Sequence, residues 1–193
     1  MTTDSASPSR TENSIPTGRD EVTAAILDSA AQLFAERGPA AASIRDIAAR
    51  ARVNHGLVFR HFGTKEQLVG AVLDHLATDL TKLLDSGGPD DELEAAIALQ
   101  SRVLARALLD GFPVDQLQHG FPAATRLIEL VRMQHDDDGA ARLATAHALA
   151  LLFGWQLLGP VLRKATGLGL DDISPDELRQ SIRAEMTRLA TPH

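Results

Sequence analysis

Basic side chains are concentrated in one short stretch of the chain, residues 43–67. Five of them lie there against two acidic side chains, which gives a local charge of +3, whereas the whole chain carries −7. The basic ones are Arg45, Arg50, Arg52, Arg60 and Lys65, and the acidic ones are Asp46 and Glu66. Guanidinium and ammonium groups bind phosphate oxygens through charge-assisted hydrogen bonds. The stretch therefore indicates attraction to a polyanion such as nucleic acid.

The apolar residues of the stretch predict the short helix that holds the first of these side chains. They recur at helical spacing, at Ile44, Ile47, Ala48 and Ala51. Ser43 is placed to cap this helix, because its hydroxyl can accept a hydrogen bond from a free backbone amide of the first turn. Residues 52–54 then form a tight turn.

A second short helix is predicted over residues 55–61, with Asn54 as its cap. Thr64 and Gln67 have the spacing of a capping box, which predicts the start of a third helix. Two short helices joined by a tight turn form a helix-turn-helix, whose second helix can enter the major groove of DNA with its N-terminus first. Gly56 has no side chain, so the backbone of that helix could come close to DNA.

The helix-turn-helix also predicts which side chains meet the DNA. We expect base contacts from Arg45, His55 and Leu57, since arginine can pair with guanine and leucine can contact a thymine methyl group. Contacts to the phosphate backbone are expected from Ser43, Asn54, His61 and Lys65. Arg52 and Arg60 are further candidates, although Arg60 could equally lie on a solvated face.

These residues resemble the N-terminal region of TetR-type (TetR/AcrR) transcriptional regulators. The usual run of that family is T-x-R-x-I-A-x-x-A-G-V-S-x-G-x-x-Y-x-H-F-x-x-K-x-x-L. The corresponding residues here are Ser43, Arg45, Ile47, Ala48, Ala51, Val53, Asn54, Gly56, Phe59, His61, Phe62, Lys65 and Leu68. Arg52 replaces the usual turn glycine, at a cost of about 1 kcal/mol if its backbone is left-handed. Phe59 replaces the usual tyrosine, so a hydroxyl contact to phosphate is lost there.

The remaining sequence predicts helices only. Helical spacing or capping signals occur over residues 20–37, 64–85, 91–110, 113–118, 122–135 and 140–166, and from Ser174 to near the end. We therefore expect an all-α protein of about nine helices. Residues 1–18 would be a disordered tail or an arm that reaches the minor groove. Residues 19–63 would form the three-helix DNA-binding domain, and residues 64–193 a helical effector-binding and dimerisation domain.

Two segments of the second half need particular explanations. Residues 143–162 are so apolar that the outer face of their helix needs a partner, which predicts a homodimer through this helix and the last one. The family resemblance implies the same four-helix contact. Residues 136–139 read Asp-Asp-Asp-Gly, which we interpret as a solvated acidic turn rather than a metal-binding loop.

The resemblance also implies a small-molecule effector bound among the C-terminal helices. The candidate ligand contacts are polar or polarizable residues on or near apolar faces: Gln100, His119, Arg126, Met133, His147 and Trp155. A core role for His147, and a core or dimer-contact role for Trp155, remain open. The implied mechanism is a two-state switch, in which the ligand favours a tilt of helix 64–85 that spoils the spacing of the two recognition helices.

Composition excludes several other classes. The chain has no cysteine, so it has neither a disulfide nor a thiol nucleophile. No secretory signal and no uninterrupted apolar run of about 18 residues is present, so we expect a cytoplasmic protein that does not bind a membrane. We find no catalytic residues, cofactor motif or metal-ligand spacing, so an enzyme is disfavoured. A helical adaptor that binds protein instead of DNA is the other alternative.

Overall fold

The computed structural model describes residue 16 and residues 18–169 and 171–191, and within these ranges the chain forms nine α-helices and no β-strand. The helices are α1 (Arg19–Ala41), α2 (Ile44–Ala51), α3 (His55–Phe62), α4 (Lys65–Ser86), α5 (Asp90–Leu109), α6 (Val114–Leu117), α7 (Pro122–Arg132), α8 (Asp138–Thr166) and α9 (Pro175–Ala190). The predicted all-α fold is confirmed. The tail predicted over residues 1–18 lies almost entirely outside the described residues.

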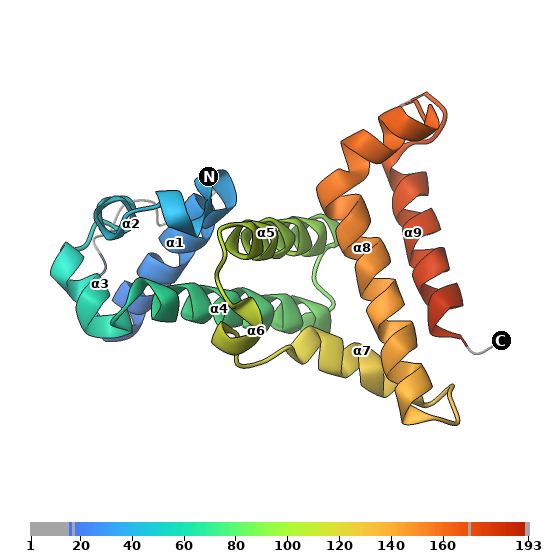
Figure 1. Ribbon diagram of the computed structural model, residues 1–193, viewed down its shortest axis with the longest axis horizontal. Coiled ribbons are helices and arrows are strands. Elements are labelled where there is room, and N and C mark those ends of the chain that lie inside the picture. Colours follow the sequence, from blue (N-terminus) through green and yellow to red (C-terminus); the bar gives the residue numbers. More distant parts are fainter. Residues whose placement is uncertain (1–15, 17, 170, 192–193) are drawn as a thin grey trace, which may run out of the picture.

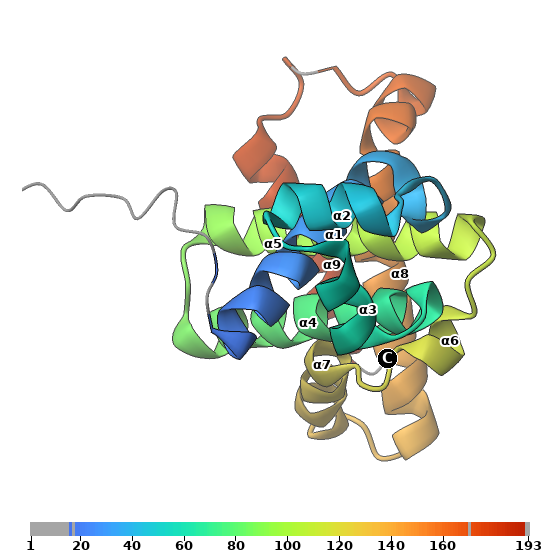
Figure 2. The ribbon, with the colours of Figure 1, turned by 90° about the vertical axis from the view of Figure 1, so that its left-hand side faces the viewer.

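Helices α1, α2 and α3 form one end of the molecule (Figure 1, left; Figure 2, facing the viewer). The starts of α2 and α3 follow the predicted capping residues. The Ser43 hydroxyl accepts from the backbone amide of Asp46, and the Asn54 side chain accepts from that of Gly56, at 2.9 Å. Helix α1 continues past its predicted end to Ala41, but its helical geometry breaks at Gly38, where φ is +83°.

The centre of the molecule is a pair of long helices, α4 and α5, which pack against each other. The predicted capping box starts α4: Thr64 accepts from the amide of Gln67, and the Gln67 side chain accepts from that of Thr64. A single buried cluster joins α1, α2, α3 and α4 with Val103 and Ala107 of α5. The core therefore crosses the domain boundary that we expected after residue 63, and α4 and α5 share it with the helix-turn-helix.

Helices α8 and α9 form the opposite end of the molecule and pack against each other (Figure 1, right). Helix α9 begins as predicted, with Ser174 and Glu177 in a capping box and Pro175 in the first turn. Helix α8 continues through Pro160 to Thr166, and Figure 1 shows its axis changing direction toward the C-terminal end. The acidic turn before it has a structural role, because Asp137 caps α8 and Asp138 pairs with Arg132 and Arg142.

Helix α8 is long and apolar enough to cross a membrane by length and composition, with a mean hydropathy of 1.4 over its most apolar part. Counting uninterrupted apolar residues did not register this, since a few polar residues interrupt the run. Its one buried side, however, consists of small residues packed on α7 and α9: Ala141, Ala144, Thr145 and Ala148. The large apolar residues of α8 therefore do not belong to this buried side.

Candidate nucleic-acid interface and ligand cavity

The N-terminal turn of α3 is the exposed tip of the helix-turn-helix. His55 and Gly56 are both exposed there, and Arg45 is exposed on α2 of the same helix-turn-helix. A Cβ atom at Gly56 would lie 3.3 Å from the capping oxygen of Asn54, so the cap and the glycine fit each other closely. The helix-turn-helix thus has an imidazole, a guanidinium and a backbone segment without a side chain on its exposed surface.

Of the five predicted basic residues, Arg50 and Lys65 are held by residues of α1. Arg50 forms a two-pronged ion pair with Glu36 of α1, at 2.6 and 3.0 Å. The Lys65 ammonium donates to the carbonyl oxygen of Ala40 at 3.0 Å, and its partial burial lowers its pKa. Arg45, Arg52 and Arg60 are exposed, and Arg45 and Arg60 have no hydrogen bond or ion pair to any described residue.

Two of the acidic residues near this surface, Asp46 and Glu36, are neutralised by partners, whereas Glu66 is exposed and forms no ion pair with a described residue. Asp46 accepts from the backbone and side chain of Ser43 and forms an ion pair with Arg37 at 2.9 Å, and these contacts hold its pKa below the usual value. The hydrogen bonds from Arg50 likewise hold the pKa of Glu36 below its usual value. Because these carboxylates are matched by cations, the exposed arginines set the sign of the local potential.

The other predicted contact residues differ in how freely they point outward. Ser43 and Asn54 are exposed, but their side-chain oxygens act as helix caps. The Leu57 side chain is half-buried against the core, and His61 lies 3.2 Å from the hydroxyl of Thr23, which fixes its ring to α1. The Phe59 side chain, in contrast, is 54% exposed.

Arg52 adopts the left-handed conformation, with φ +56° and ψ +38°, and is the single non-glycine residue with positive φ in the described ranges. It ends α2 in the position where the family usually has glycine. Its amide donates to the carbonyl oxygens of Ala48 and Ala49, so the tight turn forms despite the side chain.

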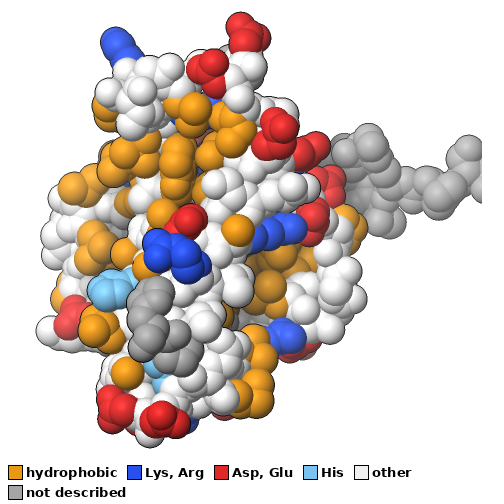
Figure 3. Space-filling model, turned by 90° about the vertical axis from the view of Figure 1, so that its right-hand side faces the viewer, with side chains coloured by type: hydrophobic (Ala, Val, Ile, Leu, Met, Phe, Trp, Pro, Cys, Tyr) orange, Lys and Arg blue, Asp and Glu red, His pale blue; other side chains and the backbone are white. Residues whose placement is uncertain are grey.

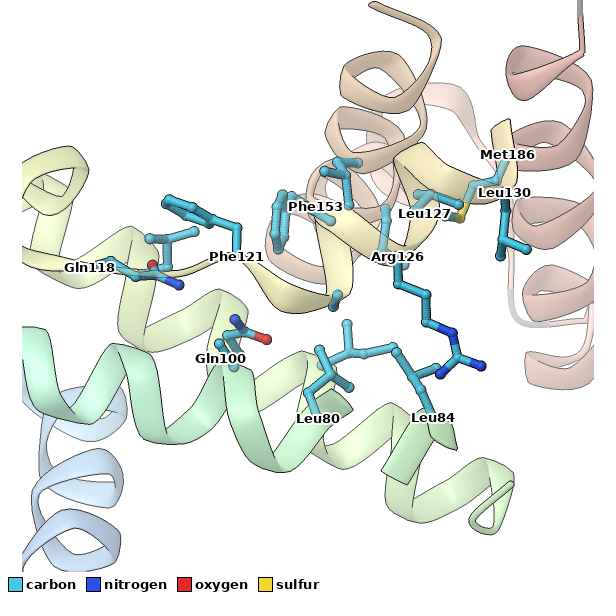
Figure 4. Close-up of a pocket in the computed structure, with 17 residues that line it drawn as sticks. Leu80, Leu84, Gln100, Gln118, Phe121, Arg126, Leu127, Leu130, Phe153 and Met186 are labelled. Atoms are coloured by element: carbon cyan, nitrogen blue, oxygen red, sulfur yellow. The ribbon is translucent and has the colours of Figure 1, made fainter. Parts of the chain in front are cut away.

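A cavity of about 520 Å³ lies among α4, α5, α7, α8 and α9, at the far end of α4 from α3 (Figure 4). Its wall is mostly apolar, with contributions from Leu80, Leu84, Ile97, Leu104, Leu127, Leu130, Leu152, Phe153 and Met186. The polar groups of the wall are Gln100, Gln118 and Arg126. The Arg126 guanidinium forms an ion pair with Asp85, so its charge is matched. This volume and lining fit a small, largely apolar molecule with a few hydrogen-bonding groups.

Two of the six predicted ligand residues, Gln100 and Arg126, line the cavity. The other four do not belong to its wall. The His119 side chain points outward and is 83% exposed, and Met133 is exposed just after α7. His147 lies on the exposed side of α8, opposite its small buried residues, and Trp155 is half-buried on the same helix. The helical period of α8 placed His147 among leucines, but those leucines, such as Leu143, are themselves on the outer side.

Sequence reasoning missed Gln118 and Phe121 as cavity residues. Gln118 is only 5% exposed, and its side-chain amide donates to the carbonyl oxygen of Gly120 at 2.9 Å. Both residues belong to the connection between α6 and α7, where no helical period marks an inner face. The sequence signal that could have indicated them is the presence of an amide and an aromatic side chain in a short connection that contains a glycine.

The outer face of α8 carries several exposed large apolar residues. Leu143, Leu157, Leu158 and Val161 are exposed there, and α9 buries none of its residues. Figure 3 looks at this end of the molecule and shows hydrophobic side chains gathered on it. Monomeric proteins rarely expose a continuous apolar surface of this kind, so it indicates a contact with another macromolecule.

Comparison with known proteins places this geometry in context. Residues 26–72 match the family described as bacterial regulatory proteins, tetR family. The chain is 61% identical over 186 residues to the HTH-type transcriptional repressor Rv3405c of Mycobacterium tuberculosis. The matched region covers 96% of this chain and 98% of that protein. It is 46% identical over 55 residues to the HTH-type transcriptional repressor KstR2 of Rhodococcus jostii, 28% of this chain and 27% of that protein.

The fold is also similar to a solved structure, that of SCO4454, a TetR-family transcriptional regulator from Streptomyces coelicolor. The two share a TM-score of 0.59 and 18% sequence identity, over 89% of this chain and 95% of that chain.

Proposed function

We propose that this chain, which belongs to the TetR family of DNA-binding transcriptional regulators, acts in the cytoplasm as a homodimeric repressor that a small-molecule effector releases from a palindromic operator. The observation that carries the proposal is the exposed tip of α3. There His55 and Gly56 are exposed, and Arg45, Arg52 and Arg60 are exposed on the same helix-turn-helix of a chain whose net charge is −7.

The contacts to DNA divide by the character of the side chains. Arg45 and His55 are free to read base edges, and the half-buried Leu57 has less reach than a fully exposed side chain. Arg52 and Arg60 would contact phosphates. Ser43, Asn54 and His61 would do so while holding the ends and the orientation of α2 and α3, with Gly56 and Phe59 close to the backbone. Lys65 would use the ammonium donors that Ala40 leaves over.

The proposed dimer is formed through α8 and α9. The exposed leucines and Val161 of α8 would pack against the same face of a second copy, since a two-fold contact uses one self-complementary patch. Such a dimer would present two α3 helices to half-sites about 34–36 Å apart on one side of the duplex. Helix α8 is also long and apolar enough to cross a membrane. We favour the subunit contact, because a relative that matches nearly the whole chain is a transcriptional repressor.

The cavity is the proposed effector site. Its apolar wall would bury most of the ligand, and the amides of Gln100 and Gln118 would fix its orientation (Figure 4). Arg126, His119, Met133, His147 and Trp155 remain candidates of lower rank, His147 and Trp155 as neighbours of the subunit contact. Ligand and operator would favour different tilts of α4, with a typical coupling of about 1–3 kcal/mol, or roughly 5- to 150-fold in operator affinity.

DNA binding is tested by fluorescence anisotropy on a duplex enriched from a random pool. Arg60→Ala should weaken binding to every duplex and reduce the slope of log affinity against log salt by about 0.9, the value for one lost phosphate contact. Arg142→Ala, at the other end of the molecule, is the matched control and should leave the slope unchanged. Binding that is insensitive to salt in the wild-type protein would favour the adaptor alternative.

A further inference from the structure

One carboxylate of α4 holds the connection that forms a wall of the cavity. The Asp74 side chain accepts three hydrogen bonds from this connection: from the backbone amide of His119 at 2.9 Å, from its ring Nδ1 at 2.9 Å, and from the backbone amide of Gly120 at 3.3 Å. Two of the three donors are backbone amides, so the contact fixes the path of the chain. A carboxylate that accepts from several donors is a strong, specific anchor.

The same connection faces the cavity on its other side. Gln118 and Phe121, which flank the two anchored residues, both line the cavity, and the buried Gln118 amide donates back to Gly120. A molecule that fills the cavity would therefore contact loop 118–121, which hydrogen bonds to Asp74 hold against α4.

The loop and α4 also meet without any room to spare. A Cβ atom at Gly70 would lie 2.4 Å from the carbonyl oxygen of Leu117, so α4 touches the backbone just before the loop. Gly70 and Asp74 are four residues apart, about one helical turn, and share a face of α4. Helix α4 begins at Lys65, three residues after α3 ends at Phe62, so a shift at Gly70 and Asp74 acts within about three helical turns of the DNA-binding helices.

We propose that Asp74 is the positioning residue through which the cavity and α3 are coupled: it ties loop 118–121 to α4, so that the state of the loop and the tilt of α4 change together. This inference rests on the proposed function. By linkage, a ligand and the operator change each other's affinity by the same factor. If loop 118–121 carries this coupling, DNA binding alters the loop even when no ligand is bound. The coupling can therefore be measured with DNA alone.

The test is hydrogen–deuterium exchange of segment 117–121 in the full-length protein, with and without a duplex enriched from a random pool. In the wild type, DNA should slow exchange in this segment as well as in α3. In Asp74→Ala, exchange of the segment should rise about tenfold or more in the free protein, because two amides lose their acceptor, and the effect of DNA on it should vanish.

Two further variants separate coupling from general loosening. Asp91→Ala removes an exposed carboxylate of α5 with no hydrogen bond or ion pair to a described residue, and it should behave as wild type at the same net charge as Asp74→Ala. Asp74→Asn keeps an oxygen that can accept from the amides of His119 and Gly120, and it should restore most of the protection and of the response to DNA. This rescue also keeps the inference testable if Asp74→Ala fails to fold.

The outcomes are distinct from those of the proposed function. If the wild-type protein binds the duplex and protects α3 while exchange in segment 117–121 stays the same, the coupling through Asp74 is wrong and the repressor proposal stands. The coupling is equally contradicted if Asp74→Ala retains the full response of the segment to DNA. If no duplex is enriched or bound, both proposals fall together.

Discussion

Arg52 combines two demands that oppose each other at the scale of one residue. The turn between α2 and α3 needs a left-handed backbone, which glycine adopts freely, whereas a cationic side chain here lies beside the proposed DNA surface. The sequence alone identified this conflict, because the family resemblance puts glycine at this position.

The backbone part of that conflict can be measured by comparing two substitutions. Arg52→Gly and Arg52→Ala remove the same guanidinium, but only glycine relieves the left-handed strain. Arg52→Gly should therefore be more stable than Arg52→Ala by about 1 kcal/mol in the free energy of unfolding, measured by urea denaturation. Both variants should bind the operator more weakly than wild type. Equal stability of the two would mean that the turn carries no strain.

His55 is the residue whose loss should change specificity instead of affinity alone. Its exposed ring at the first residue of α3 points away from the core, so His55→Ala should leave folding intact. The variant should prefer different bases at one position of each half-site, with a discrimination change of about 1–3 kcal/mol. Competition between operator variants measures this. A uniform loss against every variant would place His55 at a phosphate.

At the scale of the elements, the predicted helix starts succeeded because each rests on local chemistry. The Ser43, Asn54, Thr64 and Ser174 caps are determined by residues two or three positions apart, and all four are present. Helix ends were less certain, and α7 stops at Arg132, before the predicted position 135.

The ligand cavity could be predicted only in part, because its wall depends on how five helices pack. Gln100 was recognisable as an amide on the inner stripe of α5. In contrast, large apolar residues of α8 occur on both sides of the helix: Leu152 and Phe153 line the cavity, whereas Leu143, Leu157 and Leu158 are exposed. The usual rule that larger apolar residues lie inside therefore assigned His147 to the inner side of α8.

The contact between α1 and α4 has a histidine that makes it sensitive to pH. His75 Nε2 lies 2.8 Å from a carboxylate oxygen of Asp28 and 3.3 Å from one of Asp79. The hydrogen bond to Asp28 raises the pKa of His75, against an opposing effect of burial and of Lys82. The raised pKa means that the folded state favours the imidazolium form. Its contribution is complete below the ordinary histidine pKa of about 6.5 and is lost as pH rises through the folded-state value.

The difference in unfolding free energy between wild type and His75→Gln isolates this contribution. It should be about 0.5–1 kcal/mol larger at pH 5.5 than at pH 9, a modest amount because Asp28 is largely exposed. Urea denaturation at both pH values measures it. A difference that grows with rising pH would show that His75 acts as the neutral imidazole.

At the scale of the whole molecule, the proposed dimer would join two weak DNA contacts into one strong contact. On the outer face of α8, Leu158 is 51% exposed and Val161 is 63% exposed. Charged substitutions at these residues should therefore not disturb the fold of one subunit.

Leu158→Glu combined with Val161→Glu should give a folded monomer in analytical ultracentrifugation. Its operator affinity should fall by about 100-fold or more, since the second half-site is no longer held at high effective concentration. Leu109→Glu, at an 87% exposed leucine of α5, is the control and should remain dimeric. A double variant that stays dimeric would move the subunit contact to another surface.

The whole account depends on α3 being delivered twice to one duplex by a symmetric pair of subunits. The most direct measurement is sequencing of the duplexes that the wild-type protein enriches from a random pool at moderate salt. We predict one inverted repeat with half-sites about 10 base pairs apart, or a multiple of that spacing, bound by two chains. Enrichment of a single unrepeated site, or of no sequence at all, would contradict the account.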